Sequence, residues 1–176
     1  MGIGILVCGL NGVGKSTFGR ALAARLKFHF IDSEELFFSS ADLDSPYSAP
    51  RPRAEAIAVL ERALEDCDNF VLAAVKGDYG SRTVSEYRCA VLLEAPSEIR
   101  MRRVVDRSFQ RFEERMLPGG DLYEQELNFF ASVSDRDERY VLDWVQNLNC
   151  PMIRVDGTRT IEENLAFVME SVKGLF

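Results

Sequence analysis

Short apolar runs alternate with longer stretches of mixed polarity along most of the chain. The runs are rich in Val, Leu, Ile and Phe and lack polar alternation, which is typical of strands covered on both faces. They predict strands at residues 3–8, 28–31, 70–75, 90–93 and 152–155. The other stretches predict helices at residues 15–26, 54–64, 97 to near 114, 123–147 in one or two pieces, and 161–172. This alternation predicts an α/β fold in three layers, with a five-stranded parallel sheet between helices.

Two stretches interrupt the alternation. Residues 39–53 are rich in Ser, Asp and Pro, which favours a surface segment over an element of the core. Residues 116–121 read Met-Leu-Pro-Gly-Gly-Asp and predict a turn or hinge. The chain has 176 residues, 47% of them hydrophobic, so it can bury one sizeable core. We therefore expect one domain over residues 1–176.

The net charge limits which binding partners are expected, and the cysteines indicate the cellular compartment. The formal net charge is -7, which argues against nucleic-acid or anionic-membrane partners because their binding surfaces need clustered Lys and Arg. The four cysteines are scattered, so neither a zinc site nor a disulfide framework is predicted, as is usual in a reduced compartment. No apolar run approaches the roughly 18 residues of a membrane span, and no leader is seen before the first predicted strand. We expect a cytoplasmic monomer or homodimer.

The strongest motif follows the first predicted strand. Residues 9–16 read Gly-Leu-Asn-Gly-Val-Gly-Lys-Ser and fit G-x-x-x-x-G-K-[ST] between a strand and a helix. Backbone N–H groups of such a loop, with the dipole of the next helix, bind phosphate oxygens. Lys15 can reach the β and γ phosphates, and Ser16 can offer its hydroxyl to Mg²⁺. The motif predicts ATP and Mg²⁺ as ligands, with nucleotide contacts from Gly9, Asn11, Gly12, Val13, Gly14, Lys15, Ser16 and Thr17.

Arginines concentrate in the predicted helix that begins at residue 97. Arg100, Arg103, Arg107 and Arg111 recur at three- and four-residue spacing, which places them along one helical face. A row of like charges is more stable beside an anion, and Arg binds a transferring phosphoryl group without losing its charge. We expect a phosphate-binding lid over residues 107–125. The alternative is a solvated face whose arginines pair with nearby acids of the same helix.

Several segments together are similar to the adenylate-kinase-like nucleoside and nucleotide kinases, of which shikimate and gluconate kinases are relatives. They are the phosphate loop, Val-Leu-Leu-Glu-Ala-Pro-Ser-Glu-Ile at residues 91–99, the Arg103-Val-Val-Asp-Arg107 pair, and Met-Ile-Arg-Val-Asp-Gly-Thr at residues 152–158. The resemblance implies that Arg103 and Arg107 contact the nucleotide phosphates. It also implies that the backbone of Gly157 lies near the adenine, whereas an ordinary strand-to-helix turn is the alternative.

The second predicted strand ends in Asp32-Ser33-Glu34. The shikimate-kinase-like branch carries Asp-x-Asp at this place, so the resemblance assigns Asp32 to Mg²⁺ or to the acceptor hydroxyl and Glu34 to the acceptor. An ionised carboxylate at the carboxyl edge of a parallel strand can accept a proton there or hold the metal through water. Asp32 can equally cap a helix that starts beside it.

The third predicted strand departs from that family, because it is followed by Lys76-Gly-Asp-Tyr-Gly. Lys76 can approach an anion, Asp78 can accept from a hydroxyl, and Tyr79 can stack or hydrogen-bond; a plain polar turn is the alternative. Residues 36–53 occupy the place of the family's acceptor-binding element, in which Arg53 can contact the acceptor or serve only solubility.

These features predict a P-loop kinase with catalytic residues Lys15, Asp32, Arg103 and Arg107, and with Mg²⁺ held by Ser16 and Asp32. It would transfer the γ-phosphoryl group of ATP to a small acceptor bearing a hydroxyl or a phosphate, such as a nucleoside, a nucleotide or a shikimate-like metabolite. The alternative function is an ATP-binding switch or regulatory ATPase without a small acceptor. The third strand, which lacks an acid at its end, leaves that alternative open.

Overall fold

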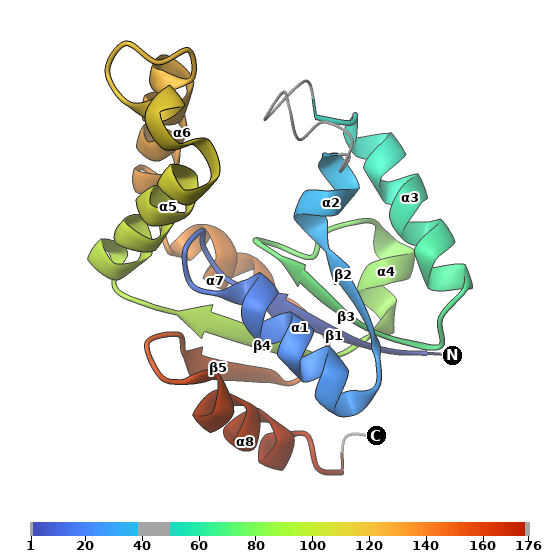
Figure 1. Cartoon of the computed structure of the whole chain (residues 1–176). Coiled ribbons are helices and arrows are strands. Elements are labelled where there is room, and N and C mark those ends of the chain that lie inside the picture. Colours follow the sequence, from blue (N-terminus) through green and yellow to red (C-terminus); the bar gives the residue numbers. More distant parts are fainter. Residues whose placement is uncertain (1, 39–49, 175–176) are drawn as a thin grey trace.

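Parallel strands form one sheet in the centre of the molecule, and the computed structural model describes residues 2–38 and 50–174. The sheet order in this part of the chain is β2-β3-β1-β4-β5 (Figure 1). The bounds are β1 Ile3–Cys8, β2 His29–Asp32, β3 Asn69–Ala74, β4 Tyr87–Glu94 and β5 Met152–Asp156. Neighbouring strands of this sheet run parallel to each other. The predicted α/β fold with a five-stranded parallel sheet is therefore confirmed.

Helices cover both faces of the sheet, because successive residues of each strand point to opposite faces. On one face, Ile5, Val7 and Val91 pack with α1 Lys15–Leu26 and α8 Ile161–Ser171. On the other face, Leu6 and Leu72 pack with α3 Arg53–Glu65 and α7 Arg139–Val145. These core side chains are fully buried. Strands buried on both faces explain the unbroken apolar runs in the sequence.

A helical arm rises from the carboxyl end of β4 (Figure 1). It contains α5 Ser97–Phe112, the short 3-10 helix η2 Glu113–Met116 and α6 Tyr123–Ser134. The arm has its own small apolar cluster, in which Phe112, Met116 and Leu122 pack together with Phe130. The predicted stretch 123–147 thus divides into α6 and α7, which are separated by a charged connection.

Two short helices are absent from the predicted elements, although a helix capped by Asp32 was one of the alternatives. They are α2 Ser33–Phe37 and α4 Ser81–Glu86. Neither is long enough to show a helical period in the sequence, and an isolated helix of this length is unstable in water. Packing stabilises both, since Leu36 of α2 lies in the main core and Thr83 of α4 is fully buried. No helix of the described residues is both long and apolar enough to cross a membrane.

The end of β1 lies at the point where the sheet order reverses. β1 pairs with β3 on one side and with β4 on the other, and the chain crosses from one side to the other around it. Ligands of open α/β sheets bind in the crevice outside the carboxyl ends of the strands at such a point. The fold therefore places residues 9–16 where a ligand is expected.

The start of α8 provides a test of the fold at a distance from that crevice. Thr160 and Glu163 form a capping box, in which the backbone N–H of Glu163 donates to Thr160 Oγ1 and that of Thr160 to Glu163 Oε2. We predict that Thr160→Ala lowers the free energy of unfolding by about 1 kcal/mol, because it leaves the backbone N–H of Glu163 without its acceptor. Urea unfolding measures the change. Thr160→Ser, which keeps the hydroxyl, should lose much less, and equal losses would contradict the capping argument.

Candidate active site

The loop of residues 9–16 ends at an uncapped helix. Gly14, the residue before α1, has no side chain to cap the helix, and the first turn contains no acid. By contrast, α2 and α8 are capped by Asp32 and Thr160. The backbone N–H groups at the start of α1 thus have no side-chain acceptor, which favours an anion at that place.

Lys15 lies inside this loop. Its Nζ donates to the carbonyl oxygen of Leu10 at 3.0 Å. Burial, followed by the nearby Arg107, lowers the pKa of Lys15 from 10.5 to about 8, against an opposing effect of Asp32. An ammonium group held out of water beside a second cation needs a negative partner. The electrostatics of the loop therefore favour a phosphate group, which supplies that charge.

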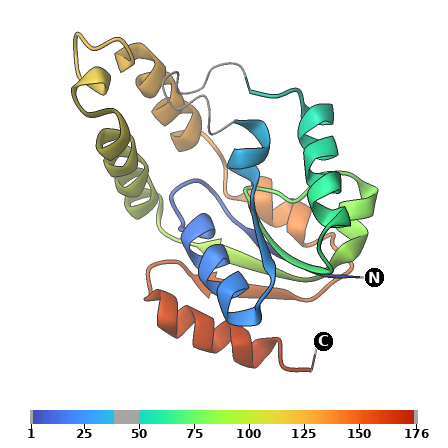
Figure 2. The same cartoon turned by 45° about the vertical axis from the view of Figure 1, so that its right-hand side comes forward.

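A cavity of about 480 Å³ opens beside Lys15. Its walls come from the loop of residues 9–16, from the end of β2 with α2, and from the α5–α6 arm, which stands across the crevice from α2 (Figure 1, Figure 2). The lining residues are Asn11, Gly12, Lys15, Ser16, Asp32, Ser33, Glu34, Phe37, Phe38, Val75, Tyr79, Arg107, Phe129 and Arg136. Predicted residues from distant parts of the sequence thus share one cavity.

Asp32 forms the floor of the cavity at the end of β2. It is 9% exposed, and its Oδ1 accepts from the backbone N–H of Glu34 at 3.0 Å. This bond caps α2, so one of the two predicted roles is present and fixes the carboxylate in place. Ser16 lines the same cavity. One carboxylate and one hydroxyl match the sparse protein ligation of Mg²⁺, which keeps waters and binds substrate phosphates.

No group of three or more His, Cys, Asp or Glu side chains that could hold a metal occurs in the described part of the chain. A dedicated metal cage is therefore not formed by these residues. That finding leaves Ser16 and Asp32 as the residues suited to a metal carried in with a phosphate ligand.

The arginines of α5 separate into different environments. Arg107 lines the cavity and lies 3.9 Å from Glu34 of α2, and Arg111 lies 3.8 Å from the same side chain. These pairs join the arm to α2 across the crevice. All three side chains are more than a third exposed, so water screens the attraction, and a ligand anion can replace Glu34 at little cost.

Arg103 does not line the cavity. Its Nη1 donates to the carbonyl oxygens of Gly157 at 2.9 Å and Gly12 at 3.4 Å. The N–H of Gly157 donates in turn to Glu94 O at 2.7 Å, and a Cβ on Gly157 would lie 2.7 Å from Val13 O. Only glycine permits this approach. Arg103 and Gly157 therefore join the phosphate loop to the β5–α8 turn, and a nucleotide contact by either stays a prediction.

Some of the residues predicted to contact the acceptor line the cavity, and others lie outside it. Tyr79 lines the cavity, is 6% exposed, and burial raises its pKa above 10.0. Arg53 and Asp78 do not line it: Arg53 donates to the backbone carbonyl of Asp78 and lies 3.5 Å from its carboxylate. Lys76 also points elsewhere, with its Nζ 3.6 Å from the ring centroid of Tyr140. Of the predicted segment 36–53, residues 39–49 lie outside the described residues.

Arg136 was not predicted from the sequence. It follows α6, lines the cavity, and donates from Nη1 to Asn11 Oδ1 at 2.9 Å. In the sequence it stands in Ser-Asp-Arg-Asp-Glu-Arg, which has the composition of a solvated charged connection. Only the fold of the arm brings this side chain back to the phosphate loop.

Comparisons with known proteins give the family of the chain. Residues 5–116 match the AAA domain family. The chain is 29% identical over 174 residues to the uncharacterized protein YqaC of Bacillus subtilis (strain 168), a match that covers 94% of this chain and 95% of that protein. It is 32% identical over 112 residues to a shikimate kinase of Nitrobacter winogradskyi, which covers 58% of this chain and 52% of that protein.

A solved structure shares the fold. The crystal structure of a gluconokinase from Sinorhizobium meliloti 1021 matches with a TM-score of 0.56 and 17% identity, over 97% of this chain and 95% of that chain. The predicted resemblance to the P-loop small-molecule kinase group is thereby confirmed.

The lowered pKa of Lys15 generates a test that needs no substrate. Between about pH 8 and pH 10.5 the unfolded chain still holds the Lys15 proton that the folded chain has lost. The free energy of unfolding should therefore rise with pH across this window, relative to Lys15→Met, which carries no titrating group there. Urea unfolding in phosphate-free buffer gives both values. Lys173→Met, at an exposed lysine, is the control; a constant difference between parent and Lys15→Met would refute the buried ammonium.

Proposed function

This chain belongs to the AAA domain family, and on that premise we propose that it is a P-loop kinase. It transfers the γ-phosphoryl group of ATP, in the presence of Mg²⁺, to a small acceptor that bears a hydroxyl or a phosphate. The observation that carries the proposal is one cavity lined by Lys15, Ser16, Asp32 and Arg107. A donor nucleotide and an acceptor can meet there, as phosphoryl transfer requires.

The phosphate loop binds the triphosphate of the donor. Its backbone N–H groups and the start of α1 surround the phosphates, and Lys15 supplies a positive charge next to the group that moves. Ser16 and Asp32 would hold Mg²⁺, which neutralises negative charge between the phosphates when it is bound. Arg107 adds charge from the arm, and Arg136 approaches from the far end of α6. These residues act by position and charge, with little covalent chemistry.

Asp32 is the group best placed to receive a proton. It is nearly buried at the floor of the cavity and held by its bond to the Glu34 N–H. When an acceptor hydroxyl attacks the γ-phosphorus, its proton passes to the Asp32 carboxylate as the new P–O bond forms and the bond to the leaving ADP oxygen breaks. The same carboxylate can also bind Mg²⁺ through a water molecule. Both roles require that Asp32 is ionised.

The acceptor lies on the α2 side of the cavity. Glu34, Phe37 and Tyr79 line that side, which offers one carboxylate, one hydroxyl and aromatic surface. Such a wall suits a compact molecule with hydroxyl groups, including a nucleoside, a nucleotide or a hydroxylated carboxylic acid such as shikimate. The shikimate kinase and gluconokinase similarities support acceptors of the last kind. Closure of the arm over the cavity, residues 107–125 included, would exclude water from the reaction.

A second function, that of an ATP-binding switch, is favoured by the end of β3. Val75 lines the cavity there, with no acid beside it, and Lys76 packs on Tyr140. A nucleotide-binding protein that signals through its arm would need no acceptor wall. Acceptor dependence of turnover separates this switch from a kinase.

We predict that release of ADP from ATP and Mg²⁺ depends on an acceptor. A panel of nucleosides, nucleoside monophosphates, shikimate and gluconate is added in turn, and ADP is followed by a coupled assay. The correct acceptor should raise the rate at least about tenfold, because water alone is a poorly positioned nucleophile. Lys15→Ala should lose both turnover and ATP affinity. A slow rate that no acceptor changes, with normal ATP binding, would favour the switch.

Asp32→Asn separates charge from helix capping. Asparagine caps a helix as well as aspartate does, so the free energy of unfolding should change by less than about 0.5 kcal/mol. The turnover number should fall by roughly 100-fold or more, because the amide cannot accept the proton. Glu35→Gln, at a carboxylate of the same helix that does not line the cavity, is the matched control. Equal turnover in parent and Asp32→Asn would remove Asp32 from the mechanism.

A further inference from the structure

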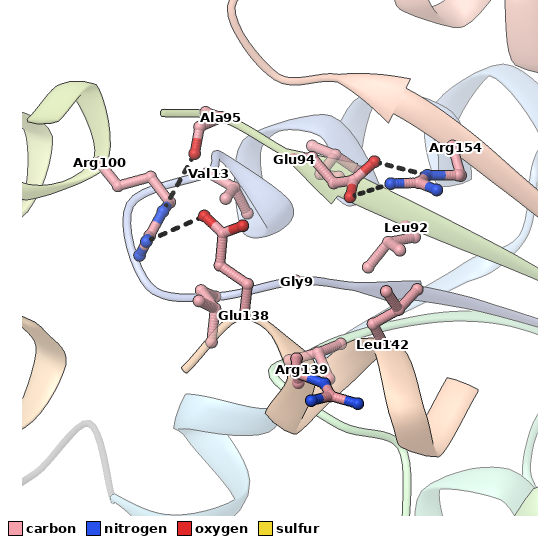
Figure 3. A pocket seen from close by; sticks show the side chains of 13 residues that line it. Gly9, Val13, Leu92, Glu94, Ala95, Arg100, Glu138, Arg139, Leu142 and Arg154 are labelled. Atoms are coloured by element: carbon pink, nitrogen blue, oxygen red, sulfur yellow. Dashed lines mark hydrogen bonds and ion pairs between the residues drawn. The ribbon is translucent and has the colours of Figure 1, made fainter. Parts of the chain in front are cut away.

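A second cavity, of about 180 Å³, lies on the other side of the phosphate loop. It is bounded by Leu10 and Val13 of the loop, by the end of β4, and by α7 (Figure 3). None of its lining residues lines the larger cavity that contains Lys15 and Asp32. The proposed kinase reaction makes no use of this space.

A buried arginine is the unusual feature of this second cavity. Arg100, in the first turn of α5, is 4% exposed, and its Nε donates to Ala95 O at 3.1 Å. Its Nη1 has no hydrogen-bond partner among the described residues. The guanidinium points toward Glu138 (Figure 3), but the pair is 3.7 Å apart and the Glu138 side chain is 74% exposed. A guanidinium cannot lose its charge, so burial leaves it short of a negative partner.

The other charges at this cavity are already matched. Arg154 and Glu94 form a two-bond pair at 2.8 and 2.7 Å, which Figure 3 shows as two dashed lines. Arg139 lies 3.9 Å from Asp143 on its own helix. Glu138 alone faces Arg100, and water competes for that exposed carboxylate. An anion inside the cavity would bind Arg100 with less competition from water.

The rest of the lining is apolar. Leu10, Val13, Leu92 and Leu142 form most of the wall. In a well-studied engineered protein, an apolar cavity of about 150 Å³ accommodates benzene, so the space here is of a size to hold a ring or a short branched chain. Inorganic phosphate would satisfy the arginine and leave this wall uncovered.

We propose that the cavity behind the phosphate loop binds a small organic carboxylate, with the carboxylate on Arg100 and a compact apolar body against Leu92 and Leu142. The site has a direct path to the loop. Leu10, which lines it, accepts the hydrogen bond from Lys15, and the backbone of Arg100 packs against Gly12, where an added Cβ would lie 2.3 Å from Arg100 O. A ligand there contacts the back of the residues that face the nucleotide.

Benzoate is a suitable probe, and its binding is measured by titration calorimetry and by saturation-transfer NMR on the whole chain. The parent should bind benzoate with a dissociation constant on the order of 1 mM, as one charged contact and a small apolar body permit. Arg100→Leu should weaken binding at least about tenfold. Replacement of a buried charge by an apolar side chain is commonly neutral or stabilising, so this variant is expected to fold.

Three further variants keep the test independent of folding. Glu138→Gln removes the exposed competitor and should tighten benzoate binding, whereas Glu98→Gln, on the same arm but outside the lining, should not change it. Leu142→Trp fills the space and should abolish binding with Arg100 intact. Binding of benzoate by Arg100→Leu at parental strength, no saturable binding by the parent, or binding of phosphate in preference to benzoate would each overturn the proposal. None of these readouts uses turnover, so the kinase proposal stands or falls separately.

Discussion

The buried ammonium of Lys15 is the interaction on which the surrounding structure depends. Within the described residues, the loop that encloses it supplies one hydrogen-bond acceptor, the carbonyl oxygen of Leu10, and Arg107 adds a second positive charge nearby. The negative charge of Asp32 raises the pKa of Lys15 and so opposes the effect of Arg107. The Asp32 carboxylate is held in place because it caps α2. A short helix that seems incidental in the sequence thus holds in place the buried carboxylate that opposes the lowering of the Lys15 pKa.

The two faces of the phosphate loop have different surroundings. The front face meets a wide, polar cavity whose charges are shared between α2 and the arm through screened ion pairs. The back face meets close backbone packing and a narrower, more apolar space. The front face is therefore held by exposed ion pairs and the back face by close backbone packing, a division that suits the proposed closure of the arm over the loop.

Much of this organisation was predictable, and particular residues show where prediction ends. Apolar runs without alternation located all strands of the sheet, because burial on both faces leaves a strong signal. The four-residue spacing of Arg103 and Arg107 placed both on one helical face, but the β5–α8 turn comes close enough to engage Arg103 while Arg107 remains over the cavity. Arg136 and Arg100 depend wholly on tertiary packing, since nothing local distinguishes a solvated arginine from a buried one. The contact of Lys76 with Tyr140 likewise depends on tertiary packing and has no local sequence signal.

The contact between Gly157 and the phosphate loop also has a consequence for the order of synthesis. The loop leaves the ribosome well before Arg103, which lies 91 residues after Gly12, and before the turn that contains Gly157. Contacts of such long sequence separation form late in folding. A nascent chain that stops before Gly157 therefore carries a complete nucleotide motif without the backbone packing that shapes it, and the ligand can stabilise the folded loop only after that turn has been translated.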